Sequence, residues 1–257
     1  VILQPPLVSV FQKRPGIGIT RAISFRELSQ ADVDYLKSTK EWESYQKSRS
    51  TRGKALDAIL FLGGAVFFDK NGVETTVGFD PNLPGPKVSD ADLQHLKGLT
   101  QLTGLILGGS MVTDAGLAHL KGLTKLEELY LDDTKVTDAG LVHLKGLTEL
   151  QALDLEGIKI TDAGLMHLKG LTKLERLHLL GTKVTDAGLI HLKGLTKLRE
   201  LNLSYTKVTD AGLAHLKGLT NLYKLHLNAT KVTDAGLVHL EGMTGLQGLF
   251  LSETRIT

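Results

Sequence analysis

Leucines recur at a fixed interval of 24 residues along the C-terminal two-thirds of the chain. Each unit reads L-x-x-L-x-L-x-x-T-K-V-T-D-A-G-L-x-H-L-K-G-L-T-x, and its L-x-L stretch alternates like a short strand. The residues that follow predict a short helix, which in one unit begins at Thr137 or Asp138 and ends at Gly146. A unit this short buries its leucines only against neighbouring units. The pattern therefore predicts a solenoid with parallel strands on a concave face and short helices on the convex side.

The N-terminal third of the chain does not follow this period. Residues 1–23 are interrupted by prolines and glycines, so an irregular, extended arm is expected there. Ser24 followed by Glu27 matches a capping box and predicts the start of a helix. A second helix is predicted over Ala55–Leu62 and ends at the glycine pair 63–64.

Two apolar runs after this helix predict a β-hairpin. Val66–Phe68 and Val73–Phe79 flank Asp69–Gly72, and an Asn-Gly pair between apolar strands is a strong hairpin signal. Val77 and Phe79 are expected at the two strand-leucine positions of a degenerate first repeat. The hairpin would then cover leucines that a terminal repeat otherwise exposes.

These patterns divide the chain into an extended arm (1–23), a helical and β-hairpin cap (24–86) and a repeat domain (87–257). The two ends of the solenoid are predicted to differ. No helix follows Ile256 to cover the last strand, Leu249–Leu251, so its backbone edge is expected to be open. Self-association of two chains through this C-terminal edge, as a two-fold dimer, is therefore expected.

The repeated unit resembles that of the bacterial, cysteine-free branch of the leucine-rich repeat family, whose members carry runs of K-V-T-D-A-G-L-x-H-L-K-G-L. The resemblance covers residues 87–257 and implies an α/β leucine-rich repeat solenoid. The chain departs from the commonest leucine-rich pattern where asparagine usually stands. Threonine occupies most of these positions, for example Thr134, and its hydroxyl can satisfy a backbone group in the turn. Ile158 can offer no hydrogen bond at the same position.

Variation between repeats is concentrated in the strand. The residue between the two strand leucines and the residues two positions before and after it face the concave side, while the helix side hardly changes. One interpretation is a binding face, because exposed aromatic side chains are typical of interfaces. The other is drift of unconstrained surface positions after duplication. The candidate binding residues are Tyr130, Asp154, Arg176, His178, Asn202, Tyr205, Lys224, His226 and Phe250.

The charged members of these rows predict a surface with two polarities. The later repeats contribute neutral to basic side chains, among them Arg176 and Lys224. The acidic side chains of the early repeats are Glu128, Asp132, Asp133, Asp154 and Glu156. A ligand that docks on this face is expected to meet a polarised trough.

Histidine recurs once per repeat on the helix side, at positions 95, 119, 143, 167, 191, 215 and 239. Successive helices are expected to lie too far apart for two of these rings to share one metal ion, so a framework role is predicted. Asp154 and His178 fall on adjacent strands and could hold a divalent ion or act as an acid–base pair. No further ligand is defined, and an open sheet face does not exclude water. Neither a metal site nor catalysis is therefore predicted.

Two rows of lysine accompany the repeats, one beginning at Lys135 and the other at Lys97. They could bind a polyanion, but a row of aspartates from Asp114 onward lies close to the first lysine row in sequence. Interleaved charges of this kind are typical of a solvated face. The net charge of +2 creates no overall field toward nucleic acid or membrane.

Composition and the absence of known motifs exclude several classes of function. The chain lacks cysteine, which excludes disulfides, thiolate zinc sites and thiol nucleophiles. It contains no nucleotide-binding or hydrolase motif. A non-enzymatic protein-binding module is predicted, with no cofactor, no nucleic-acid ligand and no membrane insertion. Two alternatives stay open: a structural spacer whose residues 1–50 make the specific contact, and the recognition part of a larger signalling or effector protein.

Overall fold

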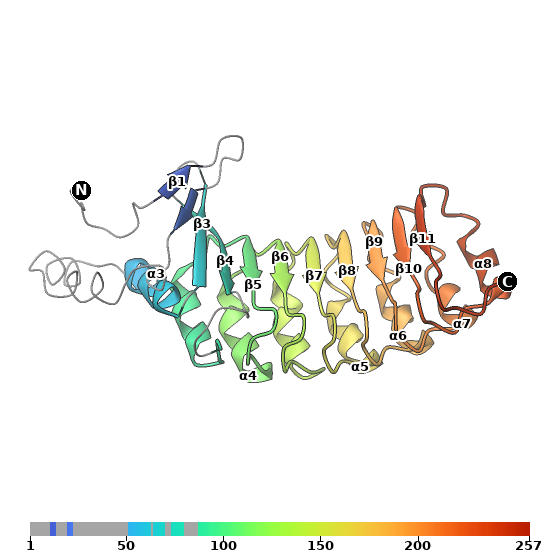
Figure 1. Cartoon of the computed structure of the whole chain (residues 1–257), viewed down its shortest axis with the longest axis horizontal. Coiled ribbons are helices and arrows are strands. Elements are labelled where there is room, and N and C mark those ends of the chain that lie inside the picture. The colour runs from blue at the N-terminus through green and yellow to red at the C-terminus, as the bar shows by residue number, and fades with distance from the viewer. Residues whose placement is uncertain (1–10, 14–19, 23–50, 63, 70–72, 80–86) are drawn as a thin grey trace, which may run out of the picture.

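The computed structural model describes residues 11–13, 20–22, 51–62, 64–69, 73–79 and 87–257. The strands in these ranges form one sheet of eleven, arranged in the order of the chain. Strands line one long side of the repeat array and helical turns line the other (Figure 1). The predicted solenoid with a parallel sheet and short helices is therefore confirmed.

The first four strands form an antiparallel extension of this sheet. They are β1 (Phe11–Lys13), β2 (Thr20–Ala22), β3 (Gly64–Phe68) and β4 (Glu74–Phe79). Each strand pairs with the next one along the chain. The predicted β-hairpin is confirmed as the β3–β4 pair, in which Val66 lies opposite Val77.

The arm predicted over residues 1–23 is not irregular throughout. β1 and β2 pair as a hairpin, and β2 joins the sheet at β3, which corrects the prediction at these two places. Strands of three residues are too short to show an alternating apolar pattern in the sequence. The helix predicted from Ser24 lies outside the described residues. The next helix, α3 (Thr51–Phe61), begins before the predicted Ala55 and buries Ile59 in the core.

Strand β4 is the first rung of the repeat array. Val77 lies opposite Leu105 in the parallel register, so Val77 and Phe79 occupy the two strand-leucine positions, as predicted. Both side chains are buried and continue the leucine core to this end of the sheet. The β3–β4 hairpin thus lies where a solenoid needs a cap.

The parallel rungs follow one another without a shift in register. The central leucine of each strand lies opposite that of the next, as Leu129 does with Leu153, and both are buried. Stacked leucines at this spacing fill the space between the strands and the helical turns. The strands are β5 (Gly104–Ile106), β6 (Glu128–Tyr130), β7 (Ala152–Asp154), β8 (Arg176–His178), β9 (Glu200–Asn202), β10 (Lys224–His226) and β11 (Gly248–Phe250).

The helix side consists of short helical segments. The α-helical ones are α4 (Asp114–Leu117), α5 (Asp162–Leu165), α6 (Asp186–Leu189), α7 (Asp210–Leu213) and α8 (Asp234–Leu237). The 3-10 segments are η3 (Asp92–Gly98), η4 (Ala118–Gly122), η5 (Gly140–Gly146), η6 (Met166–Leu168), η7 (Ile190–Leu192) and η8 (Val238–Leu240). None of the helices that the structure describes is long and apolar enough to cross a bilayer.

A threonine begins each α-helical segment. Thr161 Oγ1, for example, accepts a hydrogen bond from the backbone N–H of Ala163 at 3.3 Å, which is the capping role predicted for threonine. One unit differs from the prediction. Its helix was expected to begin at Thr137 or Asp138, but it begins at Gly140 as a 3-10 segment and ends at the predicted Gly146.

Threonine also replaces asparagine in the turn after most of the parallel strands, as the sequence indicated. The Thr134 hydroxyl donates a hydrogen bond to the carbonyl oxygen of Leu131 at 2.7 Å. The equivalent threonines at 182, 206 and 230 make the same bond. Ile158 fills this position with a buried apolar side chain in the one unit where it occurs.

An aspartate from each repeat holds the next repeat in place. Asp138 accepts hydrogen bonds from the backbone N–H of Thr161 at 2.8 Å and from its hydroxyl at 2.6 Å. A Cβ at Gly164 would collide with the Asp138 carboxylate, which explains the glycine of T-D-A-G. We call this contact the aspartate clamp. It also joins Asp90 to Thr113, Asp114 to Thr137, Asp162 to Thr185, Asp186 to Thr209 and Asp210 to Thr233.

The aspartate clamp corrects one prediction. The aspartate row was expected to be part of a solvated face, but its members from Asp114 to Asp210 are half-buried and hydrogen-bonded. Their threonine partners lie 23 residues away, so no local pattern reveals the contact. The lysines that begin at Lys135 are exposed, as expected.

Candidate binding face

Most of the predicted binding residues lie in two rows across the sheet. Strand register places Tyr130, Asp154, His178, Asn202, His226 and Phe250 side by side on β6 to β11. The second row, two positions earlier in each strand, contains Glu128, Ala152, Arg176, Glu200 and Lys224. We call the surface formed by these two rows the strand face. It is the face that was predicted to be concave.

Tyr205 does not belong to the strand face. It lies in the turn after β9 with a backbone φ of 57°, a left-handed conformation in which glycine stands in three of the other repeats. The residue is 57% exposed. The sequence correctly predicted an exposed aromatic residue but placed it on the strand. A bulky residue in this conformation is strained, so Tyr205 is not favoured there by the local backbone.

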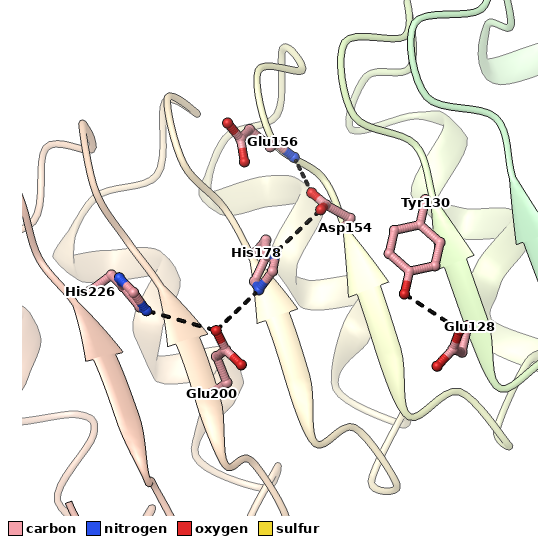
Figure 2. A network of polar contacts seen from close by, with 7 residues as sticks. All are labelled: Glu128, Tyr130, Asp154, Glu156, His178, Glu200 and His226. Carbon is pink, nitrogen blue, oxygen red and sulfur yellow. Dashed lines mark hydrogen bonds and ion pairs between the residues drawn. The ribbon is translucent and has the colours of Figure 1, made fainter. Parts of the chain in front are cut away.

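The centre of the strand face is a chain of carboxylates and imidazoles (Figure 2). His178 Nδ1 donates a hydrogen bond to Asp154 Oδ2 at 3.1 Å, and the other oxygen of Asp154 accepts from the backbone N–H of Glu156 at 3.0 Å. Glu200 Oε1 lies 3.8 Å from His178 Nε2 and 3.7 Å from His226 Nε2. The predicted proximity of Asp154 and His178 is therefore confirmed, and Glu200 extends the chain to His226.

The pKa values of the two histidines beside Glu200 are shifted in opposite directions. The hydrogen bond to Asp154 is the main cause that raises the pKa of His178 above its ordinary value, with burial opposing it. Burial is the main cause that lowers the pKa of His226, and the charges of His178 and Lys224 lower it further. The difference follows from the partners, because only His178 hydrogen-bonds a carboxylate directly.

Arg176 and Glu128 form an ion pair across the intervening strand. Arg176 Nη2 lies 2.7 Å from Glu128 Oε1, although β7 separates their strands. Ala152 is the residue between them, and its short side chain leaves the path open. The Tyr130 hydroxyl donates a long hydrogen bond of 3.4 Å to the other oxygen of Glu128. Tyr130 is half-buried rather than exposed as predicted, and burial together with the charge of Glu128 raises its pKa.

The signs of charge along the strand face are more mixed than the predicted division into an acidic early part and a neutral-to-basic later part. Glu200 lies between His178 and His226, and Arg176 of the later part is paired with Glu128 of the early part. The early repeats nevertheless carry closely spaced acids. Burial, followed by repulsion from Asp154, raises the pKa of both Asp132 and Glu156. Negative potential is therefore concentrated around β6 and β7 on a face where both signs are otherwise mixed.

A hollow of about 130 Å³ opens at the centre of the strand face. Its lining comes from four neighbouring strands and consists of Tyr130, Ala152, Leu153, Asp154, Arg176, His178 and Glu200. Four of the predicted binding residues, Tyr130, Asp154, Arg176 and His178, are thus brought together around one cavity. Ala152 and Leu153 make the apolar part, and the remaining residues provide polar groups at defined positions.

The other predicted residues lie away from this hollow. The His226 ring stacks on Phe250, with centroids 4.1 Å apart and an angle of 5° between the planes. Asn202 Oδ1 accepts a hydrogen bond from the backbone N–H of Ser204 in its own turn. Lys224 lies on β10 in the row of Glu200. These residues extend the strand face toward β11 without joining the central cluster.

Metal ligation was not predicted for this chain. Within the residues that the structure describes, no group of three or more histidine, cysteine, aspartate or glutamate side chains is arranged to hold an ion. The histidines of the helix side are half-buried, and the Nδ1 atom of His167 is buried without a hydrogen-bond partner. Burial lowers the pKa of His167, in line with a framework position rather than a proton relay.

Three residues of the hollow, Ala152, Leu153 and Glu200, were not among the sequence candidates. Glu200 and Ala152 both belong to the row that contains Arg176, which was identified as variable. The sequence places Glu200 on a strand between two strands that carry histidine, and this pattern could have predicted its contacts with both rings. Ala152 could have been noticed as the only alanine in a row that also contains glutamate, arginine and lysine. A small residue among large ones often leaves a cavity.

Comparison with known proteins agrees with this architecture. A family model described as Leucine Rich repeat matches residues 194–216. The crystal structure of internalin C2 from Listeria monocytogenes is similar at a TM-score of 0.60 and 26% identity, over 79% of this chain and 76% of that one. The Listeria monocytogenes internalin inlF is similar at a TM-score of 0.57 and 26% identity, over 68% of this chain and 55% of that one. Comparison with curated protein sequences gave no match.

The chain itself shows the features that are expected of a leucine-rich repeat fold. The 24-residue unit recurs from one rung to the next, its leucines are buried in one continuous core, and its strands pair in parallel. The matched segment 194–216 contains the L-x-x-L and T-D-A-G-L elements of one unit. The chain therefore has a leucine-rich repeat fold, similar to that of the bacterial internalins.

Proposed function

We propose that the chain is a non-enzymatic protein-binding module whose partner docks on the strand face. The observation that carries this proposal is the place where the repeats differ. The helix side uses the same threonine, aspartate and histidine in nearly every unit, whereas the strand face carries different side chains on successive rungs. Solenoids use extended surfaces of this kind to bind partners.

The side chains of the strand face are those that protein interfaces favour. Phe250 is 41% exposed, and Tyr130 forms one wall of the central hollow. Arg176 and His178 supply polar groups between these two aromatic residues. Aromatic residues and arginine are enriched in protein interfaces, whereas lysine and glutamate are depleted there. The composition of the strand face is therefore closer to that of an interface than to that of an ordinary solvated surface.

Binding also fits this face better than catalysis. The Asp154–His178 pair has the geometry of an acid–base pair, with Nδ1 and Oδ2 3.1 Å apart. The second ring nitrogen of His178 points toward Glu200, so carboxylates flank the imidazole on both sides (Figure 2). The pair lies on an open sheet where water competes for each contact, and catalytic proton transfer benefits from the exclusion of water.

Two other functions differ in what they predict for this face. A structural spacer, with the specific contact in residues 1–50, predicts that substitutions on the strand face leave partner binding unchanged. The recognition part of a larger signalling or effector protein predicts the same dependence on the strand face as our proposal does. The second function therefore extends the proposal, and only the first competes with it.

Paired substitutions test the proposal. A protein captured from the native cell should bind the Tyr130→Ala/His178→Ala variant at least about tenfold more weakly, as expected when central interface residues are truncated. The melting temperature should stay close to that of the parent chain, because neither side chain belongs to the leucine core. Surface plasmon resonance and thermal unfolding measure the two effects.

The matched control replaces Lys135, Lys159 and Lys183, which are exposed in the turns, with alanine. This control should bind the partner nearly as well as the parent chain does. If the lysine variant instead abolishes binding at low salt while the Tyr130→Ala/His178→Ala variant binds normally, the ligand is a polyanion and the proposal fails.

Self-association through the last strand is a separate proposal. β11 pairs with β10 and with no other strand in the described part of the chain, and Leu249 at the centre of β11 is 38% exposed. A second copy placed edge to edge would pair these backbone groups and cover this leucine. Sedimentation of the 257-residue chain at micromolar concentration should show a dimer. A species that stays monomeric as the concentration rises would contradict it.

A further inference from the structure

The hollow on the strand face exists because of one small residue. Ala152 lies on β7 directly between Glu128 on β6 and Arg176 on β8. These two longer side chains reach past the alanine and pair at 2.7 Å, and Arg176 is one of the residues that line the hollow. Ala152 is itself only 4% exposed, so it forms part of the floor of the hollow.

The remaining walls combine an aromatic ring with carboxylates. The Tyr130 side chain lies on one side and Asp154 and His178 on the other, as Figure 2 shows, and Glu200 contributes from the next strand. The volume of about 130 Å³ is close to the ~150 Å³ of a cavity that accommodates a benzene-sized group. The hollow therefore has room for one side chain of a partner and not for a segment of its backbone.

Negative charge is in excess around the hollow. The positive charge of Arg176 is matched by Glu128, and that of protonated His178 by Asp154. Glu200 is near two imidazoles at 3.7 and 3.8 Å and has no arginine or lysine partner among the ion pairs of the described residues. Asp132 and Glu156 lie nearby, and burial followed by repulsion from Asp154 raises the pKa of both, as expected where acids are crowded.

We propose that this hollow receives one basic side chain, a lysine or an arginine, of the protein that binds the strand face. This inference rests on the proposed function and adds the chemical class of the group that is recognised. The aliphatic stem packs against Ala152, Leu153 and the Tyr130 ring. The charged head group reaches the carboxylates of Asp154 and Glu200, and the tyrosine ring adds a cation–π contact.

Capped amino acids test the proposal without knowledge of the partner. The ¹⁵N-labelled full chain is titrated with N-acetyl-lysine methylamide, and two-dimensional amide spectra are recorded. Saturable shifts are expected at the amides of Ala152–Asp154 and Arg176–His178. The norleucine analogue, which keeps the stem but lacks the charge, should bind about tenfold more weakly, which corresponds to about 1.4 kcal/mol of charge interaction. The glutamate analogue should give no saturable shifts at these amides.

Two variants connect the shifts to the hollow. Ala152→Leu fills the space and should abolish the shifts caused by the lysine probe. Its matched control is Ala118→Leu on the exposed helix side, where other repeats carry Val142, Met166 and Ile190, and this control should respond as the parent chain does. Asp154→Asn keeps the volume and removes the charge, so it should weaken binding even if the leucine variant does not fold.

The proposal is overturned if the lysine and norleucine probes bind equally, if the glutamate probe binds better, or if the shifts persist in Asp154→Asn. Its failure is distinct from that of the proposed function. If Tyr130→Ala/His178→Ala loses partner binding but the lysine probe causes no shifts, the strand face is still the binding site. The hollow then does not receive a basic side chain. If that variant binds the partner normally, the proposal that the partner docks on the strand face is wrong, whatever the probes show.

Discussion

The helix side and the strand face are built from the same repeat, yet they are constrained in different ways. On the helix side, the Asp138 carboxylate contacts Thr161 and lies against Gly164 of the next unit, so all three residues must recur together. On the strand face, a side chain meets the outward side chains of its neighbours or a backbone N–H of its own turn. His178 hydrogen-bonds Asp154, but Asn202 and His226 pair differently at equivalent positions.

This contrast separates residues that maintain the fold from residues that are available for binding. A clamp residue has a partner of fixed identity in the adjacent repeat, and changing one member leaves a half-buried group unpaired. A strand-face residue can change without disturbing the leucine core beneath it. The comparison therefore predicts that stability and partner binding respond to different substitutions, and the experiments below test this in order of decreasing effect.

The largest effect is expected in the leucine core. Leu153 on β7 is 1% exposed, and replacing it with alanine should cost about 2–5 kcal/mol of unfolding free energy because a cavity remains. His178→Ala, one strand away on the outward side, should cost about 1 kcal/mol or less. Urea unfolding followed by circular dichroism measures both. Equal losses would show that the strand face also maintains the fold.

The aspartate clamp should give the next largest effect. Asp138→Ala leaves the backbone N–H and the hydroxyl of Thr161 without their acceptor, at a cost of about 1–3 kcal/mol. The control is Glu149→Ala, which removes an exposed ion pair with Lys173 and should cost about 0.5 kcal/mol or less. If both variants unfold at the same urea concentration, the clamp adds no stability beyond that of a surface ion pair.

Sequence reasoning succeeded where the constraint repeats. The period gave the parallel register, the buried leucines, the threonine caps and the row that contains Asp154 and His178. It failed where a contact depends on residues far apart in the chain. Arg176 and Glu128 are 48 residues apart and meet only because Ala152 between them is small, and neither local pattern nor period encodes that. Tyr205 was misplaced because a left-handed turn has no distinct signature when the residue is not glycine.

A smaller effect should distinguish the two histidines beside Glu200. In proton NMR titrations, the pKa of His178 should lie above the ordinary value of 6.5 and that of His226 below it. Asp154→Asn should lower the pKa of His178, because the hydrogen-bonded carboxylate is the main cause of its rise. An unchanged pKa in this variant would mean that Asp154 does not hold the ring in solution.

The two shifts have opposite consequences for stability. His178 binds its proton more tightly in the folded chain, so its contribution is fully present below the unfolded pKa and is lost as the pH rises through the folded pKa. His226 binds its proton less tightly when folded, so its contribution is present above the unfolded pKa and is lost as the pH falls through the folded pKa. Urea unfolding of His178→Ala and His226→Ala between mildly acidic and neutral pH should show this difference in sign.

The smallest effect is expected from zinc on the helix side. A ligand present at 100 times its dissociation constant stabilises a folded protein by about 2.7 kcal/mol and raises its melting temperature by several degrees. The described histidines of this side form no group that could hold an ion, and the free Nδ1 of His167 is buried. Zinc should therefore leave the melting temperature unchanged. A stoichiometric rise that disappears in His143→Ala/His167→Ala would show that the repeated histidines bind metal and are not only part of the framework.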